Sequence, residues 1–167
     1  EKPCIHFSGS TQTDLAQSFH PLMTFGTELY EMEIYRSFPF VCESGEYSFS
    51  EIFPALPNPH FIIQTEQRKL YHALCVLAGN FSCLLWDKFF SDLESQFNIP
   101  RAAAQIYMNQ IFKNIAQNSK NALTGPLVRG DEDTIHSNLE ALNKDPYQKV
   151  YESFVSAYKN LGDGSTK

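Results

Sequence analysis

The sequence has few cysteines and few basic residues, and it lacks several motifs that mark known chemistries. Its four cysteines form no C-x-x-C pair, so neither a zinc site nor a disulfide framework is predicted, and a reducing, cytoplasmic location fits best. Lysine and arginine number 13 against 19 acidic residues, and a net charge of -6 disfavours a nucleic-acid partner, which needs clustered basic residues. A Gly-rich phosphate loop and a G-x-S-x-G elbow are both absent.

The sequence also lacks a secretory leader and a long uninterrupted apolar run. The most apolar stretch, residues 70–86, is broken by His72, Gly79, Asn80 and Ser82, which disfavours a membrane span. The chain is nevertheless rich in core-forming residues, because 43% of it is apolar and it contains 14 phenylalanines. We therefore predict a soluble globular protein with a real core and no membrane partner.

The chain divides into two unlike parts. Residues 1–60 hold 8 acidic and 2 basic residues, whereas acids and bases balance in the rest. A Pro-rich stretch at residues 54–59 coincides with this shift, and helical periodicity follows it, so we place a boundary near Gln64. The first part is predicted to be α/β, with strands at 4–7, 38–43 and 60–64, short helices at 14–19 and 48–56, and a loop at 20–26.

The second part, residues 65–167, is predicted to be all helical. A long helix begins at Thr65 and continues until Asn98-Ile99-Pro100, and a second covers residues 101–120. Asp131 opens a third helix that runs through Leu142. The fourth has Asp145 as its cap and Pro146 at its first helical position, and it ends at Gly162.

A narrow polar stripe runs along the long helix, whose apolar residues otherwise cover most of its circumference. Such an apolar surface predicts a central helix buried by several neighbours. His72 and Asn80 in the stripe lie about 12 Å apart along the axis, a separation that suits a small substrate beside a cofactor ring. Alternatively, both are core polar residues whose hydrogen bonds are satisfied by a neighbouring loop. The stripe comprises Thr65, Arg68, Lys69, His72, Gly79, Asn80 and Asp87, interrupted by Val76 and Cys83.

The stretch Leu123–Asp131 is the second candidate site. Gly125 and Pro126 enforce a tight connection before a helix whose N-terminal amides could hold an anion, with Arg129 beside them. The alternative is an ordinary connection between helices, in which Asp131 only caps the second helix.

Five stretches, taken in order and spacing, resemble a known family. The sequence is similar to a bacterial family of NADP-dependent oxidoreductase-like proteins with an N-terminal Rossmann domain and a C-terminal helical domain of unknown function. That family is distantly related to pyrroline-carboxylate reductase and 6-phosphogluconate dehydrogenase. The resemblance extends from Ile5 to about Leu161 and is carried by the stretches Ile5–Ser10, His20–Phe25, Phe38–Glu43, Arg68–Phe81 and Thr124–Asp131.

The resemblance implies a domain organisation and a cofactor. Residues 1–64 would be the last part of a Rossmann-like domain, and residues 65–167 an all-helical domain like the C-terminal domain of 6-phosphogluconate dehydrogenase. The Gly-rich dinucleotide fingerprint should precede them, so we expect this sequence to be a piece of a longer protein. NADP is the cofactor expected for the full-length protein, and this piece alone should bind it poorly.

The resemblance also implies a site between the two domains and a homodimer formed by the helical domain. His72 would donate a proton to a carbonyl or imine as hydride arrives, Asn80 would orient the small-molecule substrate, and Arg129 would hold a carboxylate. The rival interpretation is a non-catalytic helical dimerisation or binding module. The implied cofactor side comprises Ser8, Gly9, His20 and Pro21, and the implied substrate side comprises His72, Asn80, Thr124 and Arg129.

Overall fold

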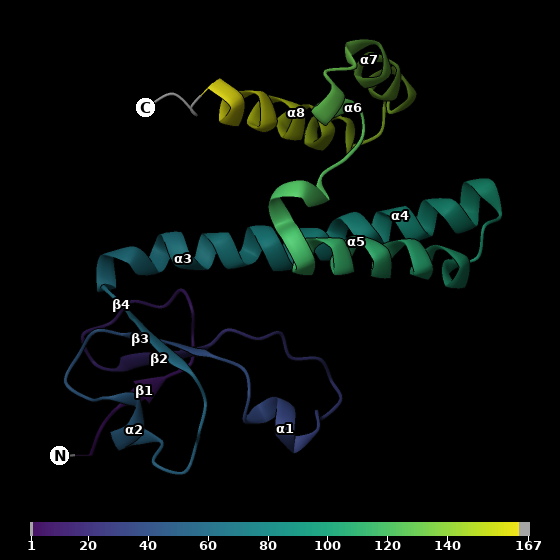
Figure 1. The fold of residues 1–167 in the computed structure, drawn as a ribbon. Helices are drawn as coiled ribbons and strands as arrows, with labels where there is room; N and C mark the ends of the chain where they lie inside the picture. Colours follow the sequence, from purple (N-terminus) through teal and green to yellow (C-terminus); the bar gives the residue numbers. More distant parts are fainter. Residues whose placement is uncertain (1, 164–167) are drawn as a thin grey trace. The chain divides into compact units, whose positions relative to one another are not determined.

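The fold is described from a computed structural model, which covers residues 2–163 (Figure 1). Contacts between Cα atoms divide the chain into two compact units, residues 1–92 and residues 93–167, and each is described by itself. The predicted domain boundary near Gln64 follows the last strand. The compact first unit extends further, because the helix after that strand contacts the sheet through several polar side chains.

A four-stranded mixed sheet is the centre of the first unit. Its strands lie side by side in chain order. The first pair is parallel, the middle pair antiparallel and the last pair parallel, with Phe19 opposite Cys42 and Val41 opposite Phe61. The strands are β1 (Ile5–His6), β2 (Gln17–Pro21), β3 (Phe40–Glu43) and β4 (His60–Ile63).

One face of this sheet is apolar, and it carries the core of the unit. Phe19, Phe40 and Cys42 pack against Phe49 of the short helix α2 (Phe49–Ile52). The helix begins with a capping box, in which Ser48 accepts from the amide of the third helical residue. Burial raises the pKa of the Cys42 thiol to about 11, so this cysteine is an inert core residue rather than a nucleophile.

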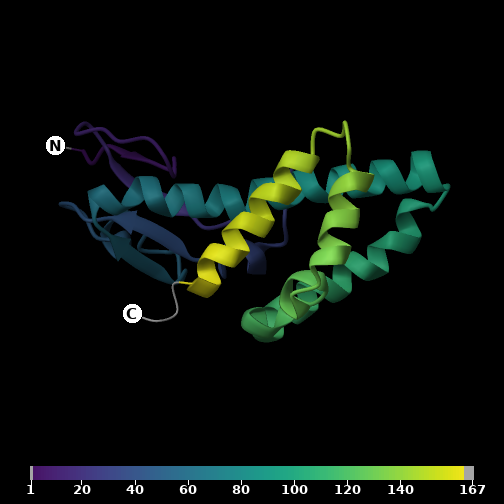
Figure 2. The same ribbon diagram turned by 90° about the horizontal axis from the view of Figure 1, so that it is seen from above.

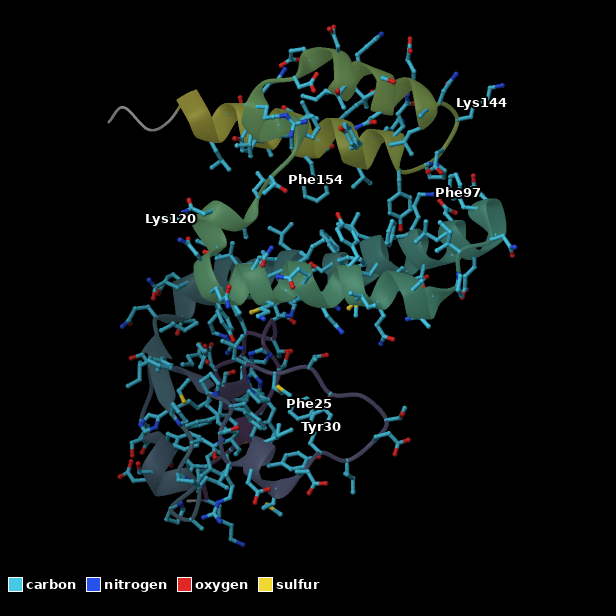
Figure 3. All side chains as sticks on the ribbon, turned by 45° about the vertical axis from the view of Figure 1, so that its right-hand side comes forward. Phe25, Tyr30, Phe97, Lys120, Lys144 and Phe154 are labelled. Carbon is cyan, nitrogen blue, oxygen red and sulfur yellow. The ribbon has the colours of Figure 1, made fainter. Side chains whose placement is uncertain are left out.

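A long excursion between β2 and β3 contains helix α1 (Met32–Tyr35), which the sequence did not predict. Phe25 and Tyr30 stack on each other along it, with ring centroids 6.1 Å apart (Figure 3). The Tyr30 hydroxyl donates to the Thr24 carbonyl and accepts from the Gly26 amide. The amide of the buried Asn58 donates to carbonyls at the end of the excursion, which joins it to the start of β4.

A continuous helical run of 33 residues follows the sheet. It begins with the 3-10 turn η1 (Thr65–Gln67), and α3 (Arg68–Cys75) is separated from α4 (Phe81–Phe97) by the single π turn η2 (Val76–Asn80). The predicted long helix is therefore present, with a widened turn in its middle. Within that turn the Phe81 amide donates to the Val76 carbonyl, and the Ser82 hydroxyl donates to the Ala78 carbonyl at 2.7 Å.

The predicted burial of this helix by several neighbours is wrong for the described chain. Only 6% of its most apolar 18-residue window is buried, and by length and composition the run could cross a membrane. Leu74 and Leu77 are 55% and 56% exposed. Apolar residues on all sides of a helix indicate that burying its surface is favourable. The pattern does not show whether the same chain, another chain or a lipid covers that surface.

The second unit consists of helices. The N-cap Asp131 of α7 accepts a hydrogen bond from the Thr134 amide, and the Asn138 side chain joins α7 to α8 by donating to the Tyr151 hydroxyl. Asn118 has non-helical backbone angles and breaks the first helix near its end. The helices after α4 are α5 (Arg101–Ala122), α6 (Pro126–Arg129), α7 (Glu132–Ala141) and α8 (Gln148–Asp163).

Three local predictions are wrong at least in part. Residues 14–19 were predicted to be helical and 20–26 to be a loop, yet β2 occupies Gln17–Pro21. The strand has a single large apolar residue, Phe19, so its alternation is invisible until two neighbouring strands pair with it. The last helix begins at Gln148 rather than Pro146, because the Asp145 carboxylate accepts from the Tyr147 amide in a preceding turn.

Candidate functional site

Helix α3 passes over the second face of the sheet (Figure 2). Polar side chains of the strands and of α3 are hydrogen-bonded to one another there. Strand alternation places Ser18 and His20 of β2 and Glu43 of β3 on this face, opposite the face that carries Phe19 and Cys42. The first turns of α3 meet them with the polar residues Arg68, Tyr71 and His72. The result is a layer of polar side chains between the sheet and helix α3.

His20 and His72 lie against Gly9, which follows the carboxyl end of β1, and Tyr71 is hydrogen-bonded to His20. The Nδ1 atom of His20 lies 2.8 Å from the Tyr71 hydroxyl, and the rings of His20 and His72 are 6.4 Å apart edge to face. A Cβ atom added to Gly9 would lie 2.7 Å from the Cδ2 atom of His72 and 2.9 Å from the Nε2 atom of His20. Only glycine allows the loop to pass this close to both imidazoles.

The electrostatic environment holds two of these groups neutral. Burial, the neighbouring His72 and the positive charge of Arg68 together lower the pKa of His20 below 6.5, so its imidazole is uncharged at neutral pH. Burial and the adjacent Cys75 thiol raise the pKa of Tyr71 above its ordinary value. The pair is therefore a neutral imidazole hydrogen-bonded to a protonated phenol.

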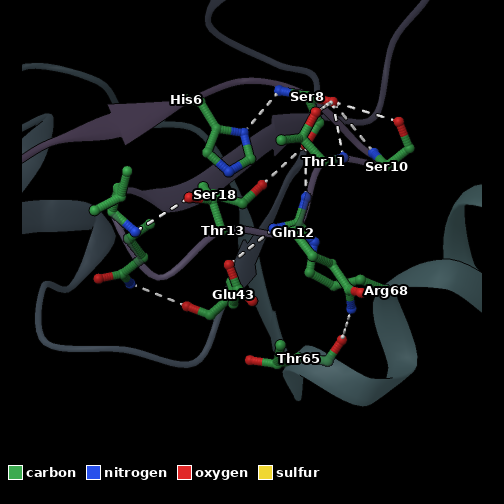
Figure 4. A network of polar contacts seen from close by, with 12 residues as sticks. His6, Ser8, Ser10, Thr11, Gln12, Thr13, Ser18, Glu43, Thr65 and Arg68 are labelled. Atoms are coloured by element: carbon green, nitrogen blue, oxygen red, sulfur yellow. Dashed lines mark hydrogen bonds and ion pairs between the residues drawn. The ribbon is translucent and has the colours of Figure 1, made fainter.

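A buried ion pair adjoins this cluster (Figure 4). Arg68, only 2% exposed, donates from Nη1 to the Glu43 carboxylate at 2.8 Å and from Nη2 to the Ser8 carbonyl at 2.7 Å. His6 accepts from the Ser8 amide at its Nδ1 atom, and burial and Arg68 lower the pKa of His6. The Nε2 atom of His6 is buried without a partner among the described residues.

The structure brings together some of the predicted site residues. Ser8, Gly9, His20 and His72 lie in this one cluster, and Pro21 is the last residue of β2, paired with Phe40. Exposed Asn80 belongs to the π turn and is not among the contacts of the cluster.

Thr124 and Arg129 belong to the second unit. Both are exposed, and Arg129 pairs with Asp131 at 3.7 Å. Asp131 itself caps α7, as the simpler interpretation of this connection proposed, and its bonds to Thr134 lower its pKa. The carboxylate therefore occupies the Thr134 amide in the first turn of α7, one of the donors that an anion would use.

A surface hollow of about 710 Å³ lies elsewhere on the first unit. Gln17, Gly45, Tyr47 and Thr65 are among its lining residues. None of the eight predicted site residues lines it. Glu43 of the buried ion pair does line it, so the hollow adjoins the polar layer although no predicted site residue faces it.

Sequence inspection missed three members of the polar layer. Tyr71 lies outside the polar stripe, on the apolar part of the predicted helix, Arg68 appears only as a member of the stripe, and Glu43 ends a predicted strand without a role. The sequence around Ser18, Phe19 and His20 is too weak a signal for a polar strand face, because one apolar residue does not establish alternation. The partners across that face depend on pairing that the sequence does not reveal.

The sheet, its polar face and the following helices define the fold class. The chain has a Rossmann-like α/β part followed by a helical region, the fold class that the sequence predicted. Residues 42–158 match the family described as Domain of unknown function (DUF2520), and the chain belongs to that family. The resemblance noted in the sequence is thereby confirmed.

Two solved structures show the same fold. A protein from Bacteroides fragilis named as a putative NADP oxidoreductase superposes with a TM-score of 0.75 at 23% identity, over 92% of this chain. This chain spans 63% of the length of that protein. A protein from Thermotoga maritima superposes with a TM-score of 0.75 at 20% identity, over 99% of this chain and 70% of its own length. No curated protein matches the sequence.

Proposed function

We propose that this chain is the second part of an NAD(P)-dependent oxidoreductase that transfers hydride to or from a small carbonyl or imine substrate. The observation that carries the proposal is the close approach of the Gly9 loop to His20 and His72. In doubly wound α/β domains, ligands bind beyond the carboxyl ends of the strands, and this loop follows the carboxyl end of β1. The name of the similar protein from Bacteroides fragilis supports the same class of reaction.

The described residues suit only one end of such a cofactor. The loop after β1 consists of small residues, two of them with hydroxyl groups: Ser8, Gly9 and Ser10. His20 and Pro21 at the end of β2 belong to the same proposed cofactor side. Together these residues would hold the nicotinamide end. The sequence contains no Gly-rich turn before a helix, so residues for the pyrophosphate are not among these 167. When bound, NADP(H) would supply or accept the hydride.

His72 is the proposed proton donor to the oxygen or nitrogen of the substrate. The ring of His20, 6.4 Å away and edge to face, is neutral and so places no positive charge beside His72. Asn80, Thr124 and Arg129 are proposed to orient the substrate, with Arg129 facing a carboxylate. The cytoplasmic location also stays a prediction.

Turnover of the full-length protein tests this proposal. NADPH oxidation is followed with a panel of small ketones, aldehydes and cyclic imines, and His72→Ala is compared with the wild type. Removing a general acid should lower kcat about 10²- to 10⁴-fold. His136→Ala is the matched control, because His136 is an exposed histidine paired with Glu140 on α7. Equal turnover of the His72 variant and this control would remove His72 from the mechanism.

A non-catalytic dimerisation module is the second candidate function, favoured by one observation. Leu70, Leu74, Leu77, Phe81 and Leu84 recur at helical spacing along α3, η2 and α4, and all are exposed. We propose that this row is part of a homodimer interface, which would cover it. A dimer alone would be compatible with either function.

Sedimentation of the full-length protein tests the interface. The double substitution Leu74→Glu and Leu77→Glu should convert the dimer to a monomer, because two carboxylates would be buried without partners. Asn143→Glu in the exposed turn before α8 is the control and should stay dimeric. A wild-type monomer would exclude the interface, and detergent-dependent solubility would instead indicate a lipid cover for this row.

A further inference from the structure

We propose that Arg68 is a positioning residue that holds the loop Ser8–Thr11 in the conformation that receives the cofactor. The inference rests on the proposed function, and it adds a residue to which neither the sequence pattern nor the family resemblance gave a role. Arg68 lies at the start of α3, and its guanidinium bridges the Glu43 side chain and the Ser8 main chain. One side chain thus connects the helix, the third strand and the loop (Figure 4).

Every polar group of Ser8 has a hydrogen-bond partner. Its amide donates to the Nδ1 atom of His6 at 3.2 Å. Its carbonyl accepts from Arg68 at 2.7 Å and from the Ser18 hydroxyl at 3.1 Å. Its hydroxyl accepts from the Thr11 hydroxyl at 2.8 Å and from the Thr11 amide at 3.1 Å. A loop fixed at both its main chain and its side chain is already ordered before a ligand arrives, which reduces the entropic cost of binding.

Two further contacts fasten the same loop to the start of the helical run. The Gln12 side chain donates to the Thr65 carbonyl at 3.0 Å, just after the loop. Gly9 lies against the His72 ring. Arg68 sits between these two contacts along the chain, so the helix and the loop are joined at three successive points. A shift of α3 relative to the sheet would move the loop with it.

The cost of burying the ion pair favours a positioning role. Arg68 and Glu43 have side chains that are 2% and 9% exposed, and taking two charges out of water offsets much of their attraction. Well-packed apolar residues of similar volume often stabilise a fold equally well. Methionines could fill this space, but they could not donate to the Ser8 carbonyl. The bond to the loop is the feature that only the arginine supplies.

The double variant Arg68→Met and Glu43→Met of the full-length protein tests the proposal, because it removes both charges together and leaves neither unpaired. We expect its melting temperature to stay near that of the wild type. The backbone amide order parameters of residues 8–11 should fall from about 0.85 to below about 0.6 in the protein without cofactor. Order parameters that stay at the wild-type value would overturn the proposal. If the variant does not fold, Arg68→Lys provides the test, because lysine keeps a charge beside Glu43 but lacks the fork that reaches Ser8 as well.

The matched control is Glu132→Met with Lys159→Met, which removes an exposed ion pair of 2.8 Å in the second unit and should leave the loop unchanged. NADPH affinity, measured by titration calorimetry, separates this inference from the proposed function. We expect the double variant Arg68→Met and Glu43→Met to bind NADPH roughly tenfold to a hundredfold more weakly than the wild type. A mobile loop with unchanged NADPH affinity would support the positioning of the loop by Arg68 and contradict the cofactor side proposed for Ser8 and Gly9.

Discussion

The Nδ1 atom of His20 shares a hydrogen bond of 2.8 Å with the Tyr71 hydroxyl, and their rings meet edge to face. The bond fixes one nitrogen of the imidazole and leaves Nε2 directed toward Gly9. A neutral imidazole has one donor and one acceptor nitrogen, so whichever role Nδ1 takes in the Tyr71 bond leaves the opposite role to Nε2.

Replacing Tyr71 by phenylalanine should destabilise the protein modestly. The ring packing is kept, but the half-buried Nδ1 atom of His20 loses its partner, which costs about 1 kcal/mol. The free energy of unfolding in urea measures the effect. Tyr158→Phe in α8 is the control, since no hydrogen bond to its hydroxyl is found among residues 2–163, and it should change stability by less than about 0.5 kcal/mol.

Stability should fall as the solution is acidified below neutrality. The pKa of His20 in the folded protein is lowered from 6.5 by burial, His72 and Arg68, so the unfolded chain takes up the proton first as the pH falls. The stabilisation that the neutral form of His20 gives the folded protein is complete above about pH 6.5. It is lost progressively as the pH falls toward the pKa of His20 in the folded protein. His6, whose pKa is lowered by burial and Arg68, acts in the same direction.

The variant His20→Gln checks this pH dependence. Its free energy of unfolding should change less between about pH 7 and about pH 5 than that of the wild type, because one of the two low-pKa histidines is gone. His136→Gln on the surface of α7 serves as the control and should keep the wild-type slope. Identical slopes for His20→Gln and the wild type would contradict a lowered pKa at His20.

Alanine at Gly9 should be destabilising, whereas alanine at Gly79 should not. The new methyl group at Gly9 would lie within 3 Å of both histidine rings, and forcing them aside should cost about 1–3 kcal/mol. No atom lies within 4 Å of the corresponding position at Gly79, so alanine there should stabilise the helix by about 0.5–1 kcal/mol. The melting temperatures of the two variants test both expectations. A Gly9→Ala variant as stable as the wild type would show that the loop can move away from the two rings.

Removing Arg68 alone should be far more damaging than removing the whole ion pair. Arg68→Met leaves the buried Glu43 carboxylate without its partner, and the expected loss is about 3–5 kcal/mol. The double variant with Glu43→Met should recover most of that loss. A double-mutant cycle in urea measures the coupling, and additive effects of the two substitutions would mean that the pair is not coupled in the folded protein.

Much of the fold was predictable because it depends on local signals. The strand at Phe40–Glu43 has bulky apolar residues, α7 has Asp131 as its cap, and the break before α5 follows from Asn98-Ile99-Pro100. The strand at Gln17–Pro21 was not predictable, since a sequence with one apolar residue among polar ones acquires its structure from the strands on both sides. The π turn in the long helix likewise has no local signal beyond Gly79.

Some features of the candidate site were likewise predictable from the sequence, and others were not. Ser8, Gly9, His20 and His72 could be named from the sequence, because they recur in a pattern that resembles a family. Their common location around one glycine, and the addition of Tyr71, needed the structure. The contacts of Tyr71 and His72 with His20 and Gly9 connect residues 50 or more positions apart, as in the bond between residues 20 and 71. No spacing rule along the sequence reaches that far.

The sequence by itself determined the helices of the second part, the apolar strand at the core and the polar stripe on the long helix, because these depend on the period and chemistry of neighbouring residues. Only the tertiary structure decided that Arg68 and His72 of the stripe meet a polar sheet face, that Arg68 pairs with Glu43, and that the apolar side of the helix is exposed. Side-chain partners across a sheet are set by strand order and register, which are properties of the whole packed unit rather than of any segment.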